Sequence, residues 1–538
     1  MGVILYDIPR PDFKRDQRTC VGPARYVRSQ HRSPKEGGFV PMGYAVKKAY
    51  WRLSKRPRCE YLGRKRLPLP PGPPGHWLFG NAPPPPYAYQ YYADLTEKYG
   101  PVVSLRYGKR IICIVGRYQA ATDILIKHSG ETMDRPRLIA AFEILSGGLR
   151  VVLTPAGDRI KRALHAFLAK DVAENYKPMQ TRNAMTYVWD CFTRPEEHMD
   201  HSKRYAASIV ISLTYGKTTP TSYSDSEVQN INRVARHFGA ALRPGAHFVD
   251  TYPFLKCIPG YLKHLYRYHE EELVFFHEMI AGVKAKLSRG EASEAFVAYL
   301  LKEQQNLRVS DNELAYLAGA MFAAGSDTTA SALSVVTMAA ALHPEAQARV
   351  QAQLDKVAGR DRAPTFEDED MLPEVTAFFM ETARWRPQFA SGFAHRATKD
   401  IIWVSSEAQT STKDYVIPAG AEVIGAHWAI ARDPDVYPDP ERFDPQRWLD
   451  EDGQLRKDMR YFRFGFGRRV CVGEHLADNS VFINTALMLW AFNITEDPAR
   501  PIDPDALTDE ANVFPQPYAA NFTPRVDRLE ELLRRDDE

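Results

Sequence analysis

The sequence predicts a mainly α-helical fold with small β-sheets, organised as a single large domain. Three observations predict it: residues 311–341 form a long helical run, most of residues 120–300 read as helices separated by loops, and alternating strand patterns occupy short stretches near residues 102–115 and 395–425. The chain has 538 residues, of which 44% are hydrophobic and 25% are charged. These values are ordinary for a globular protein with one extended core.

The first 66 residues differ in charge from the rest of the chain. Residues 1–66 contain 17 Lys and Arg against 5 Asp and Glu, a local charge of +12, whereas the remainder carries −9. This segment is rich in Pro, Gly and Arg and lacks periodicity, so we expect a disordered basic leader. A basic leader suits a nucleic acid or an anionic membrane surface. Because nothing later in the chain resembles a nucleic-acid-binding module, we expect a membrane surface and no nucleic acid.

A proline-rich segment follows the leader. Residues 67–75 read Leu-Pro-Leu-Pro-Pro-Gly-Pro-Pro-Gly, and proline fixes φ and removes backbone donors. We therefore expect a stiff, extended hinge, although an ordinary domain linker has the same composition. Residues 76–538 form the expected large domain. The chain contains no run of 18 apolar residues, so no transmembrane helix is visible in the sequence.

The expected elements have local signals. Residues 102–107 and 111–115 alternate as short strands around Gly108, which indicates a hairpin. Ser310 and Glu313 form a capping box at the start of the 311–341 helix, and His343-Pro344 closes it. Residues 415–420 read as a strand that leads into a turn, and residues from Glu474 to about Phe492 read as a helix.

The strongest chemical signal surrounds one cysteine. The six cysteines are scattered without a Cys-x-x-Cys pair, which argues against zinc and iron–sulfur sites. The segment Phe464-Gly-Phe-Gly-Arg-Arg-Val-Cys471-Val-Gly473 stands just before a helical run, and the positive end of a helix favours a thiolate there. Its glycines permit a tight turn, with amides aimed at the sulfur and the loop flat beneath a planar cofactor. A buried structural thiol is the alternative, and a dinucleotide loop is excluded because Val470 replaces the third glycine.

This segment resembles the cysteine signature of the cytochrome P-450 family of haem-thiolate monooxygenases. The signature is matched at Phe464, Gly467, Arg469, Cys471 and Gly473, and the resemblance covers about residues 67–525. It implies the cytochrome P-450 fold, haem b (iron protoporphyrin IX) as cofactor and Cys471 as the axial ligand of the haem iron. In this family the thiolate ligand favours cleavage of the O–O bond.

A second motif, Ala324-Gly-Ser-Asp327-Thr328-Thr, lies in the middle of the long helix. Glycine in a helix interior costs about 1 kcal/mol relative to alanine, so we expect a weakened hydrogen-bond ladder and a kink that opens a groove for dioxygen. An acid beside a hydroxyl can relay protons. The family resemblance makes Asp327 and Thr328 the catalytic acid–alcohol pair. The alternative is a surface carboxylate with threonines that face neighbouring helices.

A third motif is Glu381-Thr-Ala-Arg384, whose spacing places both charges on one helix face. Alone it is a weak signal, because exposed ion pairs of this kind contribute little. The resemblance adds Arg442, from Pro440-Glu-Arg-Phe443, and implies a buried structural network of Glu381, Arg384 and Arg442 beneath the haem.

The resemblance also implies partners for the haem and the substrate. Arg469 and His395 are expected to bind the haem propionates. The segment 157–165 lacks the Trp of the family's Trp-x-x-x-Arg pattern, so Lys161 or Arg162 is expected to substitute for that arginine. Expected substrate contacts are mostly apolar or aromatic, which suits a hydrophobic substrate: residues 131–148, Phe322, Ala323, Phe389–Phe393 and Phe514–Tyr518.

The leading hypothesis is a monooxygenase that inserts one oxygen atom from O2 into a hydrophobic organic substrate. Electrons would come from an NADPH–cytochrome P-450 reductase that docks on Arg463, Arg468 and Lys161. Two alternatives remain: an isomerase or dehydratase that needs no external electrons, against which Asp327-Thr328 argues, and a haem-binding protein impaired by its short segment at 157–165. The motif spelling resembles fungal members, which implies secondary metabolism. The proline hinge resembles the one that follows the membrane anchor of microsomal members, which implies the cytosolic face of the endoplasmic reticulum membrane.

Overall fold

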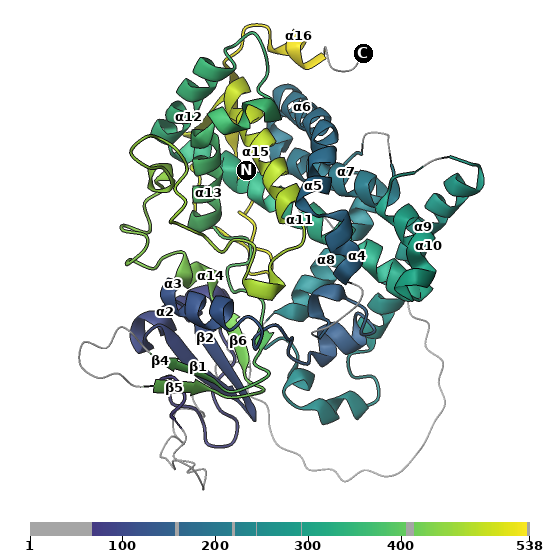
Figure 1. The fold of residues 1–538 in the computed structure, drawn as a ribbon, viewed down its shortest axis with the longest axis vertical. Coiled ribbons are helices and arrows are strands. Elements are labelled where there is room, and N and C mark those ends of the chain that lie inside the picture. Colours follow the sequence, from purple (N-terminus) through teal and green to yellow (C-terminus); the bar gives the residue numbers. More distant parts are fainter. Residues whose placement is uncertain are drawn as a thin grey trace, which may run out of the picture. The chain divides into compact units, whose positions relative to one another are not determined.

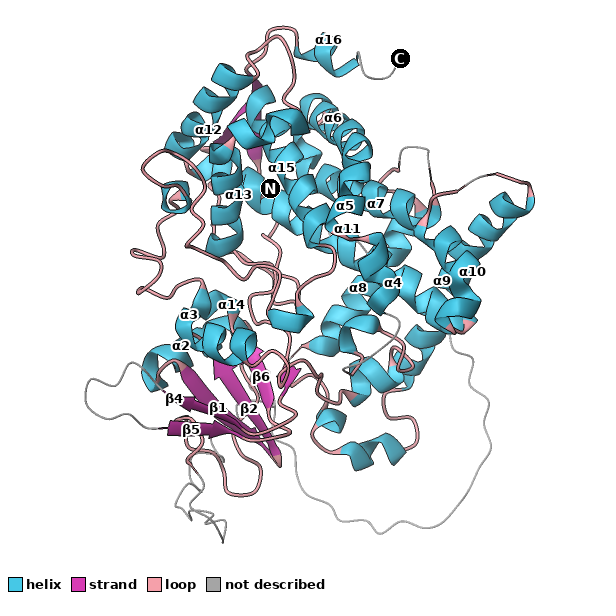
Figure 2. Cartoon of the chain, in the orientation of Figure 1, coloured by secondary structure: helices cyan, strands magenta, loops and turns pink. Residues whose placement is uncertain are grey.

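The computed structural model describes residues 67–155, 161–217, 221–243, 245–291, 293–404 and 414–534, which belong to one compact unit, Arg56–Glu538. The expected leader, residues 1–66, lies outside the described residues, as do residues 157–160 of the atypical segment. The described part is mainly helical, with its strands gathered in small sheets (Figures 1 and 2), as the sequence predicts.

The helices of the described ranges lie mostly between the hairpin of β1 and β2 and the C-terminal end, and one helix precedes this hairpin. Their bounds are α2 (Ala88–Tyr99), α3 (Tyr118–Ala121), α4 (Lys161–Phe167), α5 (Lys170–Ala173), α6 (Lys177–Thr193), α7 (His198–Tyr215), α8 (Ser226–Leu242), α9 (Lys263–Ser288), α10 (Phe296–Leu307), α11 (Asp311–Leu342), α12 (Pro344–Val357), α13 (Pro373–Trp385), α14 (His427–Ile430), α15 (Glu474–Ala491) and α16 (Leu529–Arg534). No helix of these ranges combines the length and the apolar composition needed to cross a bilayer.

The strands form one four-stranded sheet and two pairs. Their bounds are β1 (Val102–Tyr107), β2 (Arg110–Val115), β3 (His395–Arg396), β4 (Ile401–Val404), β5 (Asp414–Ile417), β6 (Glu422–Gly425), β7 (Phe492–Glu496) and β8 (Ala520–Pro524). The larger sheet has the order β1-β2-β6-β3, with β2 and β6 parallel and the other pairs antiparallel. The hairpin predicted around Gly108 is confirmed, and Gly108 has a positive φ of 59° that suits glycine.

Residues 67–75 carry no helix or strand and lie along the sheet. The amide of Ser104 in β1 donates to the carbonyl of Pro71 (2.8 Å), and the amide of Val416 in β5 donates to that of Pro68 (2.9 Å). The proline carbonyls therefore accept hydrogen bonds although the prolines themselves cannot donate any. This segment connects two sheets while it remains extended.

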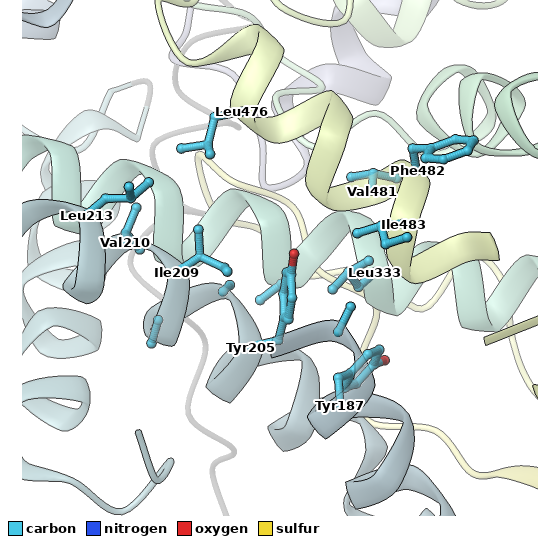
Figure 3. Packing of buried hydrophobic residues seen from close by; sticks show 14 of the residues in the cluster. Tyr187, Tyr205, Ile209, Val210, Leu213, Leu333, Leu476, Val481, Phe482 and Ile483 are labelled. Atoms are coloured by element: carbon cyan, nitrogen blue, oxygen red, sulfur yellow. The ribbon is translucent and has the colours of Figure 1, made fainter. Parts of the chain in front are cut away.

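The longest helix, α11, passes through the centre of the core. Its 32 residues span roughly 48 Å, and the predicted capping box is present: Ser310 Oγ accepts from the Glu313 amide, and the Glu313 carboxylate accepts from the Ser310 amide. Around it, apolar side chains of α6, α7 and α15 pack together, for example Tyr187, Tyr205 and Ile483 (Figure 3). α11 thus forms a rigid support between the elements that carry the candidate site.

Candidate active site

The loop that carries Cys471 is closed by its own backbone. The Cys471 amide donates to the Phe464 carbonyl (3.0 Å), and the Gly465 amide donates to the Phe462 carbonyl (2.9 Å). Gly465 and Gly467 have φ values of +88° and +53°, which side chains disfavour. The loop therefore turns tightly and presents the cysteine directly before α15.

Gly467 is needed for close packing as well as for its backbone angle. A Cβ at this position would lie 2.6 Å from the carbonyl oxygen of Leu125 and 2.5 Å from the Cβ of Ser129. Leu125 belongs to the π-helical segment Thr122–Lys127. The cysteine loop consequently packs directly against the backbone of Leu125 at this point.

The surroundings of Cys471 oppose a free thiolate. The Cys471 side chain is exposed, yet a dense shell of protein atoms desolvates it and raises the pKa of the thiol. The amide of Gly473 hydrogen-bonds to the sulfur and lowers the pKa, whereas the carboxylates of Glu474 and Asp478 raise it. The helix end alone therefore does not lower the pKa of the Cys471 thiol below its ordinary value. A metal cation at the sulfur would do so, because coordination deprotonates a thiol.

Arg469 and His395 both bond to backbone carbonyls near the loop. Arg469 Nε donates to the Met133 carbonyl (2.5 Å) and Nη2 donates to the Thr154 carbonyl (2.9 Å). His395 is buried, and its Nδ1 donates to the Thr132 carbonyl (2.8 Å). Burial, and then the charge of Arg135, lower the pKa of His395 to about 3. The ring is therefore neutral, with its proton on Nδ1.

Arg135 is a candidate partner of the haem propionates, a role that the sequence reasoning did not assign to it. It is buried, and its guanidinium donates to the carbonyls of Val152 (3.0 Å) and Ala394 (2.7 Å). Burial, and then the nearby charge of Arg469, lower its pKa to about 9. The charge of Asp134 opposes this fall. Two guanidinium groups placed close together can bind anionic groups, and the two carboxylates of haem b are such groups, so the donor set fits this cofactor. Residue 135 lies within the stretch 131–148, which the sequence reasoning assigned to substrate contacts.

The other expected propionate partners stay predictions. Lys161 is the first residue of α4, but its side chain lies outside the described residues. Arg162, beside it in α4, is exposed.

The catalytic acid–alcohol pair of the prediction lies on an unbroken stretch of α11. The helix continues through residues 324–329, and the Ser326 and Thr328 hydroxyls donate back to the carbonyls of Phe322 and Ala324 (both 2.8 Å). The kink expected at this point stays a prediction. Gly325 has a different role: a Cβ there would lie 2.4 Å from Val210 Cγ1, so the glycine lets α7 approach α11 closely.

The open face of α11 is not where the sequence placed it. Phe322 is fully buried and packs edge-on against Tyr215, 5.8 Å between ring centroids, and Ala323 is almost fully buried. Ala324, however, is exposed, directly after the buried residues 321–323. Phe322 therefore belongs to the core, and Ala324 marks the face of α11 open to a ligand.

Asp327 is held by a residue from a distant loop. Asn512 Nδ2 donates to Asp327 Oδ2 at 2.6 Å. Burial raises the pKa of Asp327 to about 6, and the bond from Asn512 opposes the rise. A carboxyl group with a pKa near neutrality can both take up and release protons at physiological pH.

The structural network contains Glu381 and Arg384, but its second arginine is Arg447. Glu381 and Arg384 are fully buried and joined by two hydrogen bonds of 2.7 and 2.9 Å. Arg447 Nε donates to Glu381 Oε1 (3.1 Å), and Trp448 Nε1 donates to Glu381 Oε2 (2.9 Å). The prediction of an Arg442 side chain in this network is therefore wrong.

Arg442 contributes its backbone only. Its side chain is exposed, and its carbonyl accepts from Arg384 and Arg447. The sequence contains two successive Pro-x-Arg-aromatic patterns, Pro440–Phe443 and Pro445–Trp448, and spacing alone does not distinguish them. The 3-10 turn Pro445–Trp448 directs Arg447 and Trp448 together toward α13, which decides between them.

Comparisons with known proteins agree with this geometry. The family model for "Cytochrome P450" matches residues 70–521. Cytochrome P450 monooxygenase 88 of Postia placenta is 61% identical over 468 residues, which cover 86% of this chain and 93% of that protein. A cytochrome P450 monooxygenase of Armillaria gallica is 36% identical over 500 residues, 89% of this chain and 94% of that protein. The chain belongs to the cytochrome P450 family of haem-b-dependent monooxygenases.

Proposed function

We propose that this enzyme inserts one atom of O2 into a hydrophobic organic substrate, with electrons from an NADPH-dependent reductase. The observation that carries the proposal is the exposed Cys471 residue, which stands before α15, with the buried Arg135 and the half-buried Arg469 near its loop. Haem b, when bound through that sulfur, supplies the iron at which dioxygen is activated. The family matches and the fungal relatives support this class of reaction.

The residues of the chain have separate tasks. Cys471 ligates the iron, and the Gly473 amide bonds to its sulfur. Arg135 and Arg469 neutralise the propionates, together with His395 if the added negative charge protonates its ring. Asp327 holds a proton and Thr328 stands beside it on α11, next to the exposed Ala324. Protons are thus available at the open face of the helix.

Apolar groups favour an apolar substrate. Phe389 and Phe393 pack with ring centroids 4.9 Å apart and are only half-buried, and Phe514 is half-buried as well. Because half-buried aromatic rings gain free energy when apolar surface covers them, they suit a hydrophobic molecule. The fungal origin of the relatives favours a substrate of secondary metabolism.

The reductase would dock near the cysteine loop through Arg468. Arg468 is exposed, whereas Arg463 is half-buried, paired with Asp478 and stacked on Phe464 (4.7 Å). Replacing Arg468 by Glu should therefore raise the apparent KM for the reductase, with Arg528→Glu, an exposed arginine on another surface element, as the control. Unchanged reduction kinetics in Arg468→Glu would contradict this docking face.

The basic leader would hold the enzyme at the cytosolic face of the endoplasmic reticulum membrane. Its local charge of +12 over residues 1–66 supports attraction to anionic lipids. Cell fractionation tests this proposal, and activity found entirely in the soluble fraction would contradict it.

The central test is spectroscopic. The reduced, carbon-monoxide-bound protein should show the red-shifted Soret band of thiolate ligation, and Cys471→Ser should abolish it. Cys257→Ser, which replaces another exposed cysteine, should retain it. With reductase present, NADPH and O2 should be consumed and the product should gain one oxygen atom. Substrate conversion without NADPH would instead indicate an isomerase or dehydratase.

A further inference from the structure

The loop Thr508–Phe514 is clamped against α11 and the segment after α13. The Ser331 hydroxyl of α11 donates to the Val513 carbonyl (2.7 Å), and the Val513 amide donates to the Gln388 carbonyl (2.7 Å). Across the loop, the Thr508 amide donates to the Phe514 carbonyl, and the Phe514 amide donates to Thr508 Oγ1. The backbone of this loop is therefore held independently of any contact that its side chains make.

Asn512 projects from this loop onto the carboxyl group of Asp327. Its residue is 7% exposed, and Nδ2 donates to Asp327 Oδ2 at 2.6 Å. Within the described ranges, the other end of the same amide, Oδ1, is buried without a hydrogen-bond partner. A buried polar atom without a partner is costly. We therefore expect Asn512 Oδ1 to form a hydrogen bond in another state of the site.

A carboxamide can serve both protonation states of a carboxyl group. An ionised carboxylate only accepts hydrogen bonds, so Nδ2 must face it, as in the structure. A protonated carboxyl group also donates, and a half-turn of the amide would bring Oδ1 to accept from it. No other side-chain type of this size offers a donor and an acceptor at equivalent positions.

We propose that Asn512 is a positioning residue that holds the Asp327 carboxyl group in one orientation in both of its protonation states. Nδ2 donates to the carboxylate, and Oδ1 accepts from the protonated acid after the amide turns. The inference rests on the proposed function, in which Asp327 relays protons on the open face of α11. It assigns to the Thr508–Phe514 loop a part in proton delivery.

Other charges reach Asp327 from several elements. Glu510, in the same loop, raises the pKa of Asp327, whereas Lys203 of α7 and Arg236 of α8 lower it. These groups act through space, since the hydrogen bond to the carboxylate comes from Asn512. Removal of that bond should therefore destabilise the ionised form and raise the pKa of Asp327.

The test compares Asn512→Leu and Asn512→Asp with the wild-type full-length holoenzyme. Ser331→Ala is the matched control, because it cuts another tie between α11 and the same loop without touching Asp327. The infrared band of the protonated Asp327 carboxyl group, isolated by subtraction of the matching Asp327→Asn spectrum, is followed against pH. The ratio of H2O2 released to NADPH consumed is measured on the same samples.

We expect the midpoint of the infrared titration to rise by about one pH unit in Asn512→Leu. In Asn512→Asp, which keeps the shape but adds a second carboxyl group, the midpoint should rise further. Ser331→Ala should keep the wild-type midpoint, and only the Asn512 variants should release more H2O2 per NADPH.

An unchanged midpoint in both Asn512 variants would overturn the proposal, as would a shift in Ser331→Ala as large as that in Asn512→Leu. A different outcome is that Asp327→Asn releases as little H2O2 per NADPH as the wild type, while the Asn512 variants show the expected infrared shifts. This outcome would refute the proton-relay role of Asp327 but support its positioning by Asn512.

Discussion

Replacing Arg447 by Met should destabilise the protein far more than replacing Arg442 by Met. Arg447 is 8% exposed at its side chain and bonds to the fully buried Glu381, whereas the Arg442 side chain is exposed. Met keeps the aliphatic length of both side chains, so the comparison isolates the guanidinium group. The two arginines lie five residues apart on the same segment, which makes them matched sites.

The magnitude follows from the bonds that are lost. Arg447→Met removes one charge-assisted bond, worth about 1.5–3 kcal/mol, and two weaker bonds to carbonyls of 3.3 Å each. Because Glu381 keeps its hydrogen bonds from Arg384 and Trp448, we expect the free energy of unfolding to fall by about 2–3 kcal/mol. Arg442→Met should stay within about 0.5 kcal/mol, because the carbonyl that accepts bonds remains.

The assay is urea unfolding followed by far-UV circular dichroism, with haem loss followed by the Soret band. A bound cofactor makes a single unfolding free energy poorly defined, so the variants are compared by midpoint and by rate of haem loss at equal haem content. Glu381→Gln, which leaves two buried guanidinium groups without a carboxylate, should cost about 3–5 kcal/mol. If Arg442→Met lowered the midpoint as much as Arg447→Met, the assignment of the network would be refuted.

Three further predictions follow from other contacts. Gly325→Ala should lower the thermal midpoint and the free energy of unfolding, by about 1–3 kcal/mol, because its Cβ would lie 2.4 Å from Val210 Cγ1. Adding Val210→Ala should recover part of this loss. Additive effects of the two substitutions in a double-mutant cycle would contradict the clash. Arg135→Met should accelerate haem transfer to apomyoglobin without destabilising the haem-free protein, because it removes a buried cation. Equal transfer rates in Arg135→Met and the wild type would show that Arg135 does not face the propionates. Asp327→Asn should stabilise the protein above pH 6, because the pKa of Asp327 is raised from 3.8 to about 6 and ionisation in the folded state then costs about 3 kcal/mol. The folded wild type binds this proton more tightly than the unfolded chain, so the advantage of the variant should fade as pH falls from 6 toward 3.8; melting curves against pH that run parallel would disprove the raised pKa.

Local signals in the sequence were enough for several elements and for the turn of the cysteine loop. The hairpin around Gly108 and the capped helix α11 depend on turn and cap residues close in sequence, and both are present. The loop around Cys471 depends on backbone freedom at glycines and on the helix that follows, and its residues also lie within ten positions. Such features need no knowledge of distant contacts.

The environment of each charge was decided by the tertiary structure. Arg135 becomes a candidate haem-site residue because the fold buries it near Arg469, and Arg447 replaces Arg442 because one turn of backbone aims it at Glu381. Asn512 meets Asp327 from 185 positions away. Desolvation and hydrogen bonding depend on what surrounds a group in space, and neither spacing nor residue type contains that information. The amino-acid sequence by itself determined which atoms can do the chemistry, and the fold decided their charge, their orientation and their partners.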